Sequence, residues 1–306
     1  LSQAICANDA ARVEQLLRLG VSPFDTWYIV YHQADPEVYG EDDTTSPLIE
    51  ATLRGFAEVV KTLLLHGASP SHTDVINNTA LHWAIATCHW NCLMLLLNHG
   101  SPLEAANYRL RTPLMQAAFY GHERVVQHLI DRGAKVDRPL NGNKESALTI
   151  SCEMGDVDIT KILLNVGNRS HDQGRQLYIA LSRAAFLGHI EVVQLLLAQG
   201  AEVNRCEDDI EAPIFAAVSR GHSGILKLLI AHHGNIEERN KMGYTPLMLA
   251  TQLGAEAMVT ELIDAGANID AVANNGRETA LLIARTHGQW DVEKVILAAL
   301  ARSRHS

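Results

Sequence analysis

The residues most able to do chemistry in this chain are its 15 histidines and 5 cysteines, which could bind a metal ion or act in catalysis. Residues 88–92 read Cys-His-Trp-Asn-Cys, but no second pair of ligands follows at a spacing typical of zinc sites. Residues 221–224 read Gly-His-Ser-Gly, one residue short of a nucleophile elbow, and they fall at an expected helix start rather than after a strand. The sequence contains no phosphate-binding loop and no paired-carboxylate motif. We therefore predict that the chain is not an enzyme, that it holds no metal or cofactor, and that these residues have structural roles.

The elements that would position these side chains are visible in residues 111–133, which read RTPLMQAAFYGHERVVQHLIDRG. Thr112 and Pro113 are residue types favoured at the cap and first turn of a helix. After Gly121, apolar residues recur at helical spacing, which predicts a second helix with one buried face. Gly133 ends that helix, because glycine enters the left-handed conformation at little cost. The segment therefore predicts two short helices joined by a turn.

This unit recurs along the chain at a nearly constant step. Positions equivalent to Thr112 follow one another at 33, 33, 34, 33, 33, 33 and 34 residues, at Ser46, Thr79, Thr112, Ser146, Ile179, Ala212, Thr245 and Thr279. The glycine between the helices keeps the same phase, except that Cys88 replaces it once, and His233 replaces the final glycine of one unit. The pattern resembles the ankyrin repeat, a turn and two antiparallel helices with a Thr-Pro-Leu-His-x-Ala signature. The resemblance implies an all-α solenoid of about nine helix-turn-helix repeats with short β-turn or hairpin tips, in which neighbouring repeats supply one another's core.

The phase of the repeat divides the chain into successive parts. Residues 1–24 form a partial first repeat, residues 25–44 an aromatic and acidic insertion, residues 45–303 repeats two to nine, and residues 304–306 a tail. The insertion either belongs to a binding face or folds back on the first two repeats. In the last repeat Glu293 stands where an apolar residue is normal, which suits a terminal cap, although truncation of a longer array would leave a similar pattern. Because the chain begins inside a helix, we expect it to be a fragment of a longer protein.

The composition restricts the class of partner. The chain has 306 residues, 47% apolar and 20% charged, which is ordinary for a soluble protein, and its net charge is −10. An acidic chain with scattered Lys and Arg argues against nucleic acid and favours a basic or neutral protein or peptide ligand. No run of 18 apolar residues occurs, so we expect no membrane partner.

The cysteines indicate the compartment. Their spacing is not that of a disulfide scaffold, and we interpret them as reduced, buried thiols of an intracellular protein. We accordingly expect a cytoplasmic or nuclear location, and we expect a monomer.

The ankyrin resemblance also implies where partners bind. In that family, the turn tips and the exposed end of the first helix of each repeat contact partners on the concave face. Carried onto this sequence, those positions give Tyr108, Arg109, Arg111, Phe119, Tyr120, Met154, Tyr178, Phe186, Leu187 and Tyr244. Exposed aromatic rings beside arginine are typical of binding hot spots. The alternative is that these rings pack against neighbouring repeats.

One further motif concerns modification. Residues 196–204, LLAQGAEVN, resemble the ankyrin-repeat asparagine that intracellular asparaginyl hydroxylases modify. This makes Asn204 a candidate for hydroxylation, since most other units carry no asparagine at the equivalent place.

Some units are also similar to a narrower group, the MASK-type proteins with many ankyrin repeats and a single KH domain. The similarity rests on residues 144–149, KESALT, on residues 243–248, GYTPLM, and on the alternation of Thr-Ala-Leu and Thr-Pro-Leu openings. The insertion at 25–44 departs from that pattern, and these 306 residues contain no KH domain.

Taken together, the sequence favours a non-catalytic interaction scaffold or adaptor that binds a protein or peptide along its concave ankyrin surface. The alternative is the targeting or regulatory arm of a larger enzyme, such as a ubiquitin ligase subunit or a kinase, whose catalytic part lies outside these residues. A third interpretation is a self-associating structural array.

Overall fold

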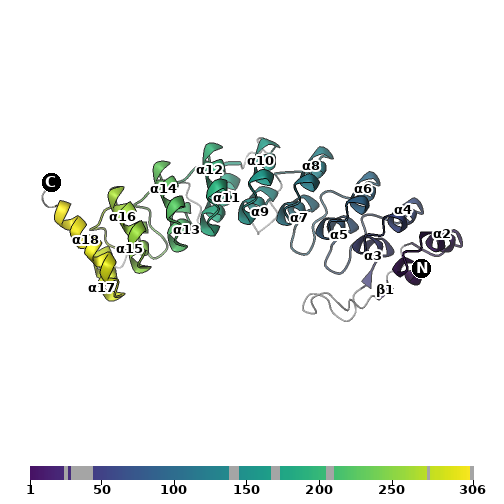
Figure 1. The fold of residues 1–306 in the computed structure, drawn as a ribbon, viewed down its shortest axis with the longest axis horizontal. Helices are drawn as coiled ribbons and strands as arrows, with labels where there is room; N and C mark the ends of the chain where they lie inside the picture. The colour runs from purple at the N-terminus through teal and green to yellow at the C-terminus, as the bar shows by residue number, and fades with distance from the viewer. Residues whose placement is uncertain are drawn as a thin grey trace. The chain divides into compact units, whose positions relative to one another are not determined.

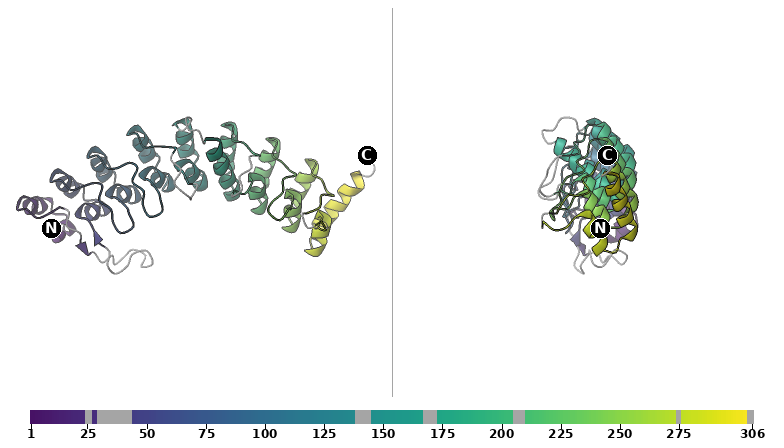
Figure 2. Two further views of the ribbon diagram at one scale, coloured as in Figure 1. Left: turned by 180° about the vertical axis from the view of Figure 1, so that it is seen from behind. Right: turned by 90° about the vertical axis from the view of Figure 1, so that its left-hand side faces the viewer.

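The computed structural model describes residues 1–23, 27–28, 44–137, 145–166, 173–204, 210–273 and 276–303. These residues form paired helices and one short hairpin, which confirms the predicted all-α repeat architecture (Figure 1). The chain separates into two compact units, Leu1–Ala147 and Leu148–Ser306. Figure 2 shows the helix pairs of each unit from two further sides.

In unit 1 each repeat contributes a first and a second helix. The first helices are α1 (Ser2–Cys6), α3 (Pro47–Leu53), α5 (Ala80–Ala86) and α7 (Pro113–Phe119). The second helices are α2 (Ala10–Arg18), α4 (Ala57–Leu65), α6 (Trp90–Asn98) and α8 (Glu123–Asp131). Strand β1 (Trp27–Tyr28) pairs antiparallel with β2 (Thr44–Thr45). These strands lie within the insertion and at its end, and most of the insertion lies outside the described residues.

The repeat openings form the helix caps that the sequence predicts. Ser46 Oγ and Thr112 Oγ1 each accept a hydrogen bond at 3.3 Å from the backbone N–H three residues further on. In repeat three the backbone N–H of Thr79 donates to His82 Nδ1 at 3.2 Å. Hydrogen bonds at these three opening residues therefore satisfy polar groups left over at the helix starts.

A contact between repeats uses an imidazole at the start of the second helix, directly after the mid-repeat position that is Cys88 in repeat three and glycine in repeats six and seven. In unit 1, His89 Nε2 donates to the carbonyl of Leu53 at 3.1 Å, and a Cβ added to Gly55 would come within 2.8 Å of the ring. Gly55 also has a φ of 74°, so both space and backbone conformation require glycine there. In unit 2, His189 and His222 make the same bond to the preceding repeat.

The junction between repeats three and four departs from this arrangement. Cys88 occupies the glycine position with a φ of 57°. Because a Cβ now stands where the ring of the next repeat would pack, His122 cannot take the position that His89 takes one repeat earlier. His122 Nε2 is buried with no hydrogen-bond partner among the described residues, and its ring stacks on Tyr120 with 5.9 Å between centroids. One residue change therefore removes a hydrogen bond between two repeats.

The cysteines only partly match the prediction of buried thiols. Cys92 and Cys152 are buried, and burial raises the pKa of their thiols to about 11 and about 12. For Cys6 and Cys88 the prediction is wrong, because both are exposed at the end of a first helix rather than enclosed between helices. Cys206 lies outside the described residues.

Unit 2 repeats the same pairing. Its first helices are α9 (Ala147–Met154, which starts at the last residue of unit 1), α11 (Gln173–Leu187), α13 (Pro213–Ser219), α15 (Pro246–Gln252) and α17 (Ala280–Thr286). Its second helices are α10 (Val157–Val166), α12 (Ile190–Ala198), α14 (Ser223–Ala231), α16 (Glu256–Asp264) and α18 (Trp290–Ser303).

Helix α11 is longer than the repeat predicts. It has 15 residues and begins at Gln173, whereas the repeat phase predicts a helix start at Ile179. Repeat six has Ile179-Ala180 where other repeats have a capping hydroxyl followed by proline, so no residue there stops the helix from extending towards its N-terminus. Tyr178 consequently lies inside a helix and not on a turn tip.

The last repeat carries a charged pair at core positions. Arg285 Nε and Glu293 Oε1 form an ion pair at 2.7 Å. The equivalent residues of the preceding repeat, Thr251 and Val259, are both fully buried. Two charged side chains thus stand at repeat positions that are buried in the preceding repeat, and the interpretation of this repeat as a terminal cap stays a prediction.

Candidate functional site

Five of the predicted contact residues come together in unit 1. Tyr108, Arg109 and Arg111 lie on the tip before α7, while Phe119 ends α7 and Tyr120 follows it. They line a cavity of about 210 Å³ together with Ile76, Asn78, Trp83, Ala86, Asn107 and Gln116. We call this cavity and its lining residues the aromatic groove. It is built by two neighbouring repeats, the third and the fourth.

One asparagine holds the tip that carries Tyr108. Asn107 Oδ1 accepts hydrogen bonds from the backbone N–H groups of Arg109 and Arg111, both at 3.0 Å. The backbone N–H of Tyr108 donates to the carbonyl of Ile76 on the preceding tip at 2.9 Å. These bonds fix the two tips against each other, so the groove presents Tyr108 and Arg109 on an ordered turn.

Buried side-chain amides line part of the groove. Asn107 Nδ2 donates to Asn78 Oδ1 at 3.0 Å and to Gln116 Oε1 at 3.1 Å. Gln116 Nε2 in turn donates to the carbonyl of His82 at 3.2 Å. All three amides are buried, and their mutual hydrogen bonds offset the cost of removing them from water.

Trp83 also lines the groove, from α5, although it is not among the contact residues that repeat position predicts. Its Nε1 donates to Asp74 Oδ2 at 2.7 Å, while Asp74 Oδ1 accepts from the backbone N–H groups of Ile76 and Asn78 at 3.0 and 2.8 Å. Trp83 occupies the same repeat position as Gln116, four residues after the opening threonine. A tryptophan at that position was the signal that could have found it.

His82 connects repeats three and four through hydrogen bonds. Its Nδ1 accepts from the backbone N–H of Thr79, and its Nε2 donates to the carbonyl of Arg111 at 3.2 Å. Burial lowers the pKa of His82 to about 4, and the hydrogen bond to Arg111 opposes this only in part. The neutral ring is therefore the form that bridges the repeats.

The ring of Phe119 lies partly buried against Arg111. The guanidinium carbon is 4.1 Å from the ring centroid, and Arg111 Nε is 3.7 Å from Glu145 Oε2. Only 13% of the Arg111 side chain is exposed, so this arginine is held between the ring and the carboxylate. The ring therefore packs within the stack and also lines the groove, and its role in binding stays a prediction.

Tyr108 and Tyr120 are the exposed rings of the groove. They remain 47% and 45% exposed. Arg109 Nε donates to Tyr108 Oη at 2.5 Å, with the guanidinium carbon 5.3 Å from the ring centroid. Tyr120 packs edge-on against Phe119, with 5.3 Å between centroids. Both rings offer a large apolar area with a polar end, which is the type of surface that binding interfaces use.

Unit 2 holds the remaining predicted contact residues. Met154 and Leu187 are exposed at the ends of α9 and α11, as the repeat position predicts. Phe186 is half-buried, with the guanidinium carbon of Arg220 4.0 Å from its ring centroid. Leu253, at the equivalent end of α15, is exposed as well. These residues belong to a different unit from the aromatic groove.

The prediction of exposed rings is wrong for Tyr178 and Tyr244, which are only 1% and 6% exposed. Tyr178 is buried because α11 extends through its position. Tyr244 Oη donates to Glu278 Oε2 of the next repeat at 2.8 Å, and this hydrogen bond, with burial and the negative charge, raises the pKa of Tyr244. Both rings are therefore core residues.

Asn204, the hydroxylation candidate, lies exposed on the tip side of unit 2. Its Nδ2 donates to the carbonyl of His233 at 2.8 Å, and its Oδ1 accepts from the backbone N–H of Asn235 at 2.7 Å. The side chain thus links repeats six and seven, and its modification stays a prediction.

The described residues show no metal site and no membrane-spanning helix. No group of three or more His, Cys, Asp or Glu side chains lies close enough to hold a metal ion within the described ranges. In the segment 88–92, His89 bonds to the preceding repeat and Cys92 is buried, so neither is placed as a ligand. No described helix has both the length and the apolarity needed to cross a bilayer.

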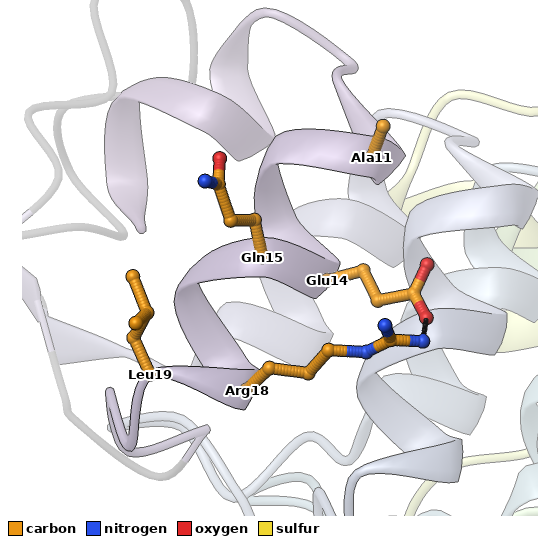
Figure 3. A pocket seen from close by; sticks show the side chains of 5 residues that line it. All are labelled: Ala11, Glu14, Gln15, Arg18 and Leu19. Carbon is orange, nitrogen blue, oxygen red and sulfur yellow. Dashed lines mark hydrogen bonds and ion pairs between the residues drawn. The ribbon is translucent and has the colours of Figure 1, made fainter.

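A second cavity, of about 250 Å³, lies on α2 (Figure 3). Ala11, Glu14, Gln15, Arg18 and Leu19 line it, so a single helix and the residue after it form the whole surface. Glu14 and Arg18 pair with each other across one helical turn. Because no second element contributes and its charges are satisfied internally, this surface is a weaker candidate than the aromatic groove.

Comparison with known proteins agrees with the repeat pattern. A family model described as "Ankyrin repeats (3 copies)" matches residues 1–107, 48–139, 114–207, 181–273 and 214–302. The matches overlap and together extend through most of the chain.

Several curated proteins are similar over part of the chain. "Probable E3 ubiquitin-protein ligase XBOS32" of Oryza sativa subsp. japonica is 39% identical over 87 residues, which are 28% of this chain and 18% of that protein. "Putative ankyrin repeat protein FPV014" of fowlpox virus is 29% identical over 139 residues, or 45% and 31%. "Ankyrin repeat and KH domain-containing protein mask-1" of Caenorhabditis elegans is 30% identical over 127 residues, or 40% and 5%. The chain thus spans less than a third of each of these relatives.

Proposed function

Because the chain belongs to the ankyrin-repeat family, we propose that it is a non-catalytic recognition module that binds a protein or peptide through the aromatic groove. One observation carries the proposal: Tyr108 and Tyr120 are exposed beside a cavity that Arg109 and Arg111 also line. Tyrosine and arginine are enriched among the residues that dominate binding energy at protein interfaces.

The size of the groove supports a protein or peptide ligand over a small molecule. Its volume of about 210 Å³ lies below the range of roughly 300–1,000 Å³ that is usual for small-molecule sites. A volume of this size fits one anchoring side chain of a larger partner.

The groove also needs little rearrangement to bind. The tip bonds of Asn107 and the amide contacts of Gln116 hold its walls before any partner arrives. Groups that are already ordered lose little conformational entropy on binding, so more of the contact energy remains as affinity.

Site-specific photo-crosslinking tests the proposal. A photoreactive phenylalanine at position 120 should crosslink a defined partner in cells of the source organism, and the Tyr108→Ala variant should lose that crosslink. The control places the same group at Leu65, which is exposed on α4 and does not line the groove. Identical sets of crosslinked proteins from positions 120 and 65 would reject the groove as the binding site.

A second candidate function follows from the rice relative, whose name describes a probable ubiquitin ligase. In that case these residues would be the targeting arm of an enzyme with its catalytic part elsewhere in the protein. Ubiquitin transfer by the full-length protein, dependent on its region outside these residues, would support this function. No transfer with a panel of ubiquitin-conjugating enzymes would reject it.

The proposal includes a cytoplasmic or nuclear location and a monomeric state. Cys92 and Cys152 are buried like small apolar residues, and such thiols persist in a reducing compartment. Cell fractionation tests the location, and sedimentation equilibrium tests the oligomeric state.

A further inference from the structure

We infer that the aromatic groove selects a peptide segment in which one large apolar side chain stands beside a carboxylate. The inference rests on the proposed function and adds the chemistry of the partner to it. It follows from the rings that line the groove and from the pairing state of each charged group around it.

The rings define the apolar half of the recognised segment. Trp83, Phe119, Tyr108 and Tyr120 all line the cavity. A side chain that enters among them is removed from water on several sides, so a large apolar side chain gains most from the contact. The cavity volume of about 210 Å³ suits one such side chain rather than several.

The carboxylates near the groove, Asp74 and Glu145, already have partners within the chain, so they do not favour a basic ligand. Both oxygens of Asp74 accept hydrogen bonds, from two backbone N–H groups and from Trp83 Nε1. Glu145 lies beside Arg111 at 3.7 Å. A lysine or arginine of a partner would have to compete with these existing contacts.

Arg109 differs from these carboxylates, because none of the ion pairs among the described residues involves its guanidinium. Its Nε donates to Tyr108 Oη. A guanidinium has five N–H donors in a planar fork that matches a carboxylate. The side chain is exposed, held at the groove by Tyr108, and has most of its donors available. It is therefore the group that recognises an acid.

This local chemistry differs from what net charge indicates. A chain of net charge −10 favours a basic or neutral partner at long range. Salt screens charges beyond about 8 Å at physiological ionic strength, so the groups inside the groove decide what docks there. Arg109 consequently outweighs the distant acidic residues.

Selection from a random peptide library tests the inference. A phage-displayed library of random dodecapeptides is selected on the wild-type chain and separately on the Arg109→Glu variant. Wild-type selection should enrich peptides with Asp or Glu next to one large apolar residue, and these should lose about tenfold or more in affinity for Arg109→Glu. The Arg109→Glu selection should enrich Lys or Arg at the same place. The control is Lys135→Glu, the same charge change at an exposed residue outside the groove, and it should leave affinity unchanged.

Three outcomes separate the inference from the proposed function. Selected peptides that depend on Tyr120 but carry no acid, or bind Arg109→Glu equally well, overturn the inference and leave the groove as a binding site. A single-stranded oligouridine that displaces the selected peptides and loses affinity for Arg109→Glu also overturns it, because arginine and stacked rings suit nucleic acid too. Enrichment of no Tyr120-dependent peptide overturns the inference together with the proposed function.

Discussion

Replacing Cys88 with glycine should stabilise unit 1, although it removes a side chain. At this position Gly55, one repeat earlier, allows His89 to reach the carbonyl of Leu53. Cys88 holds a Cβ there at a φ of 57° and leaves His122 Nε2 buried without a partner in the part of the chain that the structure describes. Cys88→Gly should let the His122 ring pack against the backbone and donate to the carbonyl of Ala86, which is equivalent to Leu53.

Three contributions set the size of the effect. Relief of the left-handed conformation gains about 1–2 kcal/mol. The greater freedom of glycine in the unfolded chain opposes this by about 0.4–1 kcal/mol. The hydrogen bond of His122 adds about 1 kcal/mol. The free energy of unfolding should therefore rise by about 1–2.5 kcal/mol, which corresponds to an increase in Tm of roughly 2–10 °C.

Thermal and urea unfolding of the full chain measure this change, and two variants control for its cause. Cys88→Ala keeps both the Cβ and the backbone conformation, so its stability should stay close to that of the wild type. Gly55→Ala creates the same conflict at the preceding junction, where the new Cβ would lie 2.8 Å from His89, and it should destabilise the protein. An unchanged or lower Tm for Cys88→Gly, with His122 Nε2 still unbonded in its structure, would refute the reasoning.

Three further predictions concern stability and assembly. His82 has a pKa of about 4 when folded and 6.5 in its unperturbed state, so the unfolded chain binds more protons between these two pH values. The free energy of unfolding should therefore fall by about 3 kcal/mol as the pH drops from 6.5 to 4, and His82→Gln should flatten this dependence in urea unfolding. Tyr244→Phe removes the donor to Glu278 and should cost about 1 kcal/mol in the free energy of unfolding without changing the affinity for groove-selected peptides; a change in that affinity would reject its assignment as a core residue. Replacing the Arg285–Glu293 pair with Leu and Val should expose an apolar face and cause concentration-dependent association in sedimentation, and a monomer at every concentration would contradict the prediction that the pair prevents association.

The repeat architecture could be predicted because it depends on local and strongly patterned signals. A hydroxyl cap such as Thr112, a proline after it and a glycine between the helices act within a few residues, and the period multiplies them. The prediction of a helix start failed at Ile179, where those signals are absent and α11 extends to Gln173. The residues there already showed the loss of the cap, but the direction in which the helix would extend depends on packing within the repeat.

The groove was predicted less completely than the fold. Repeat position placed Tyr108, Arg109 and Tyr120 at exposed tips and helix ends. It did not distinguish Tyr244 from the exposed residues, although its ring is buried and its hydroxyl donates to Glu278 of the next repeat. It also missed Trp83. The groove is lined by residues of two repeats, and the position of a residue within its own repeat does not show which side chains of the next repeat lie beside it.

Hydrogen exchange of the chain, free and bound to the partner that crosslinks at position 120, tests the central claim most directly. If the aromatic groove receives the partner, backbone amides at 107–111 on the tip and at 83–87 around the end of α5 should exchange more slowly in the complex. Amides of α4 and α8 should be unchanged. Slower exchange confined to α4, α8 or unit 2, with no change at 107–111, would contradict the assignment of the groove.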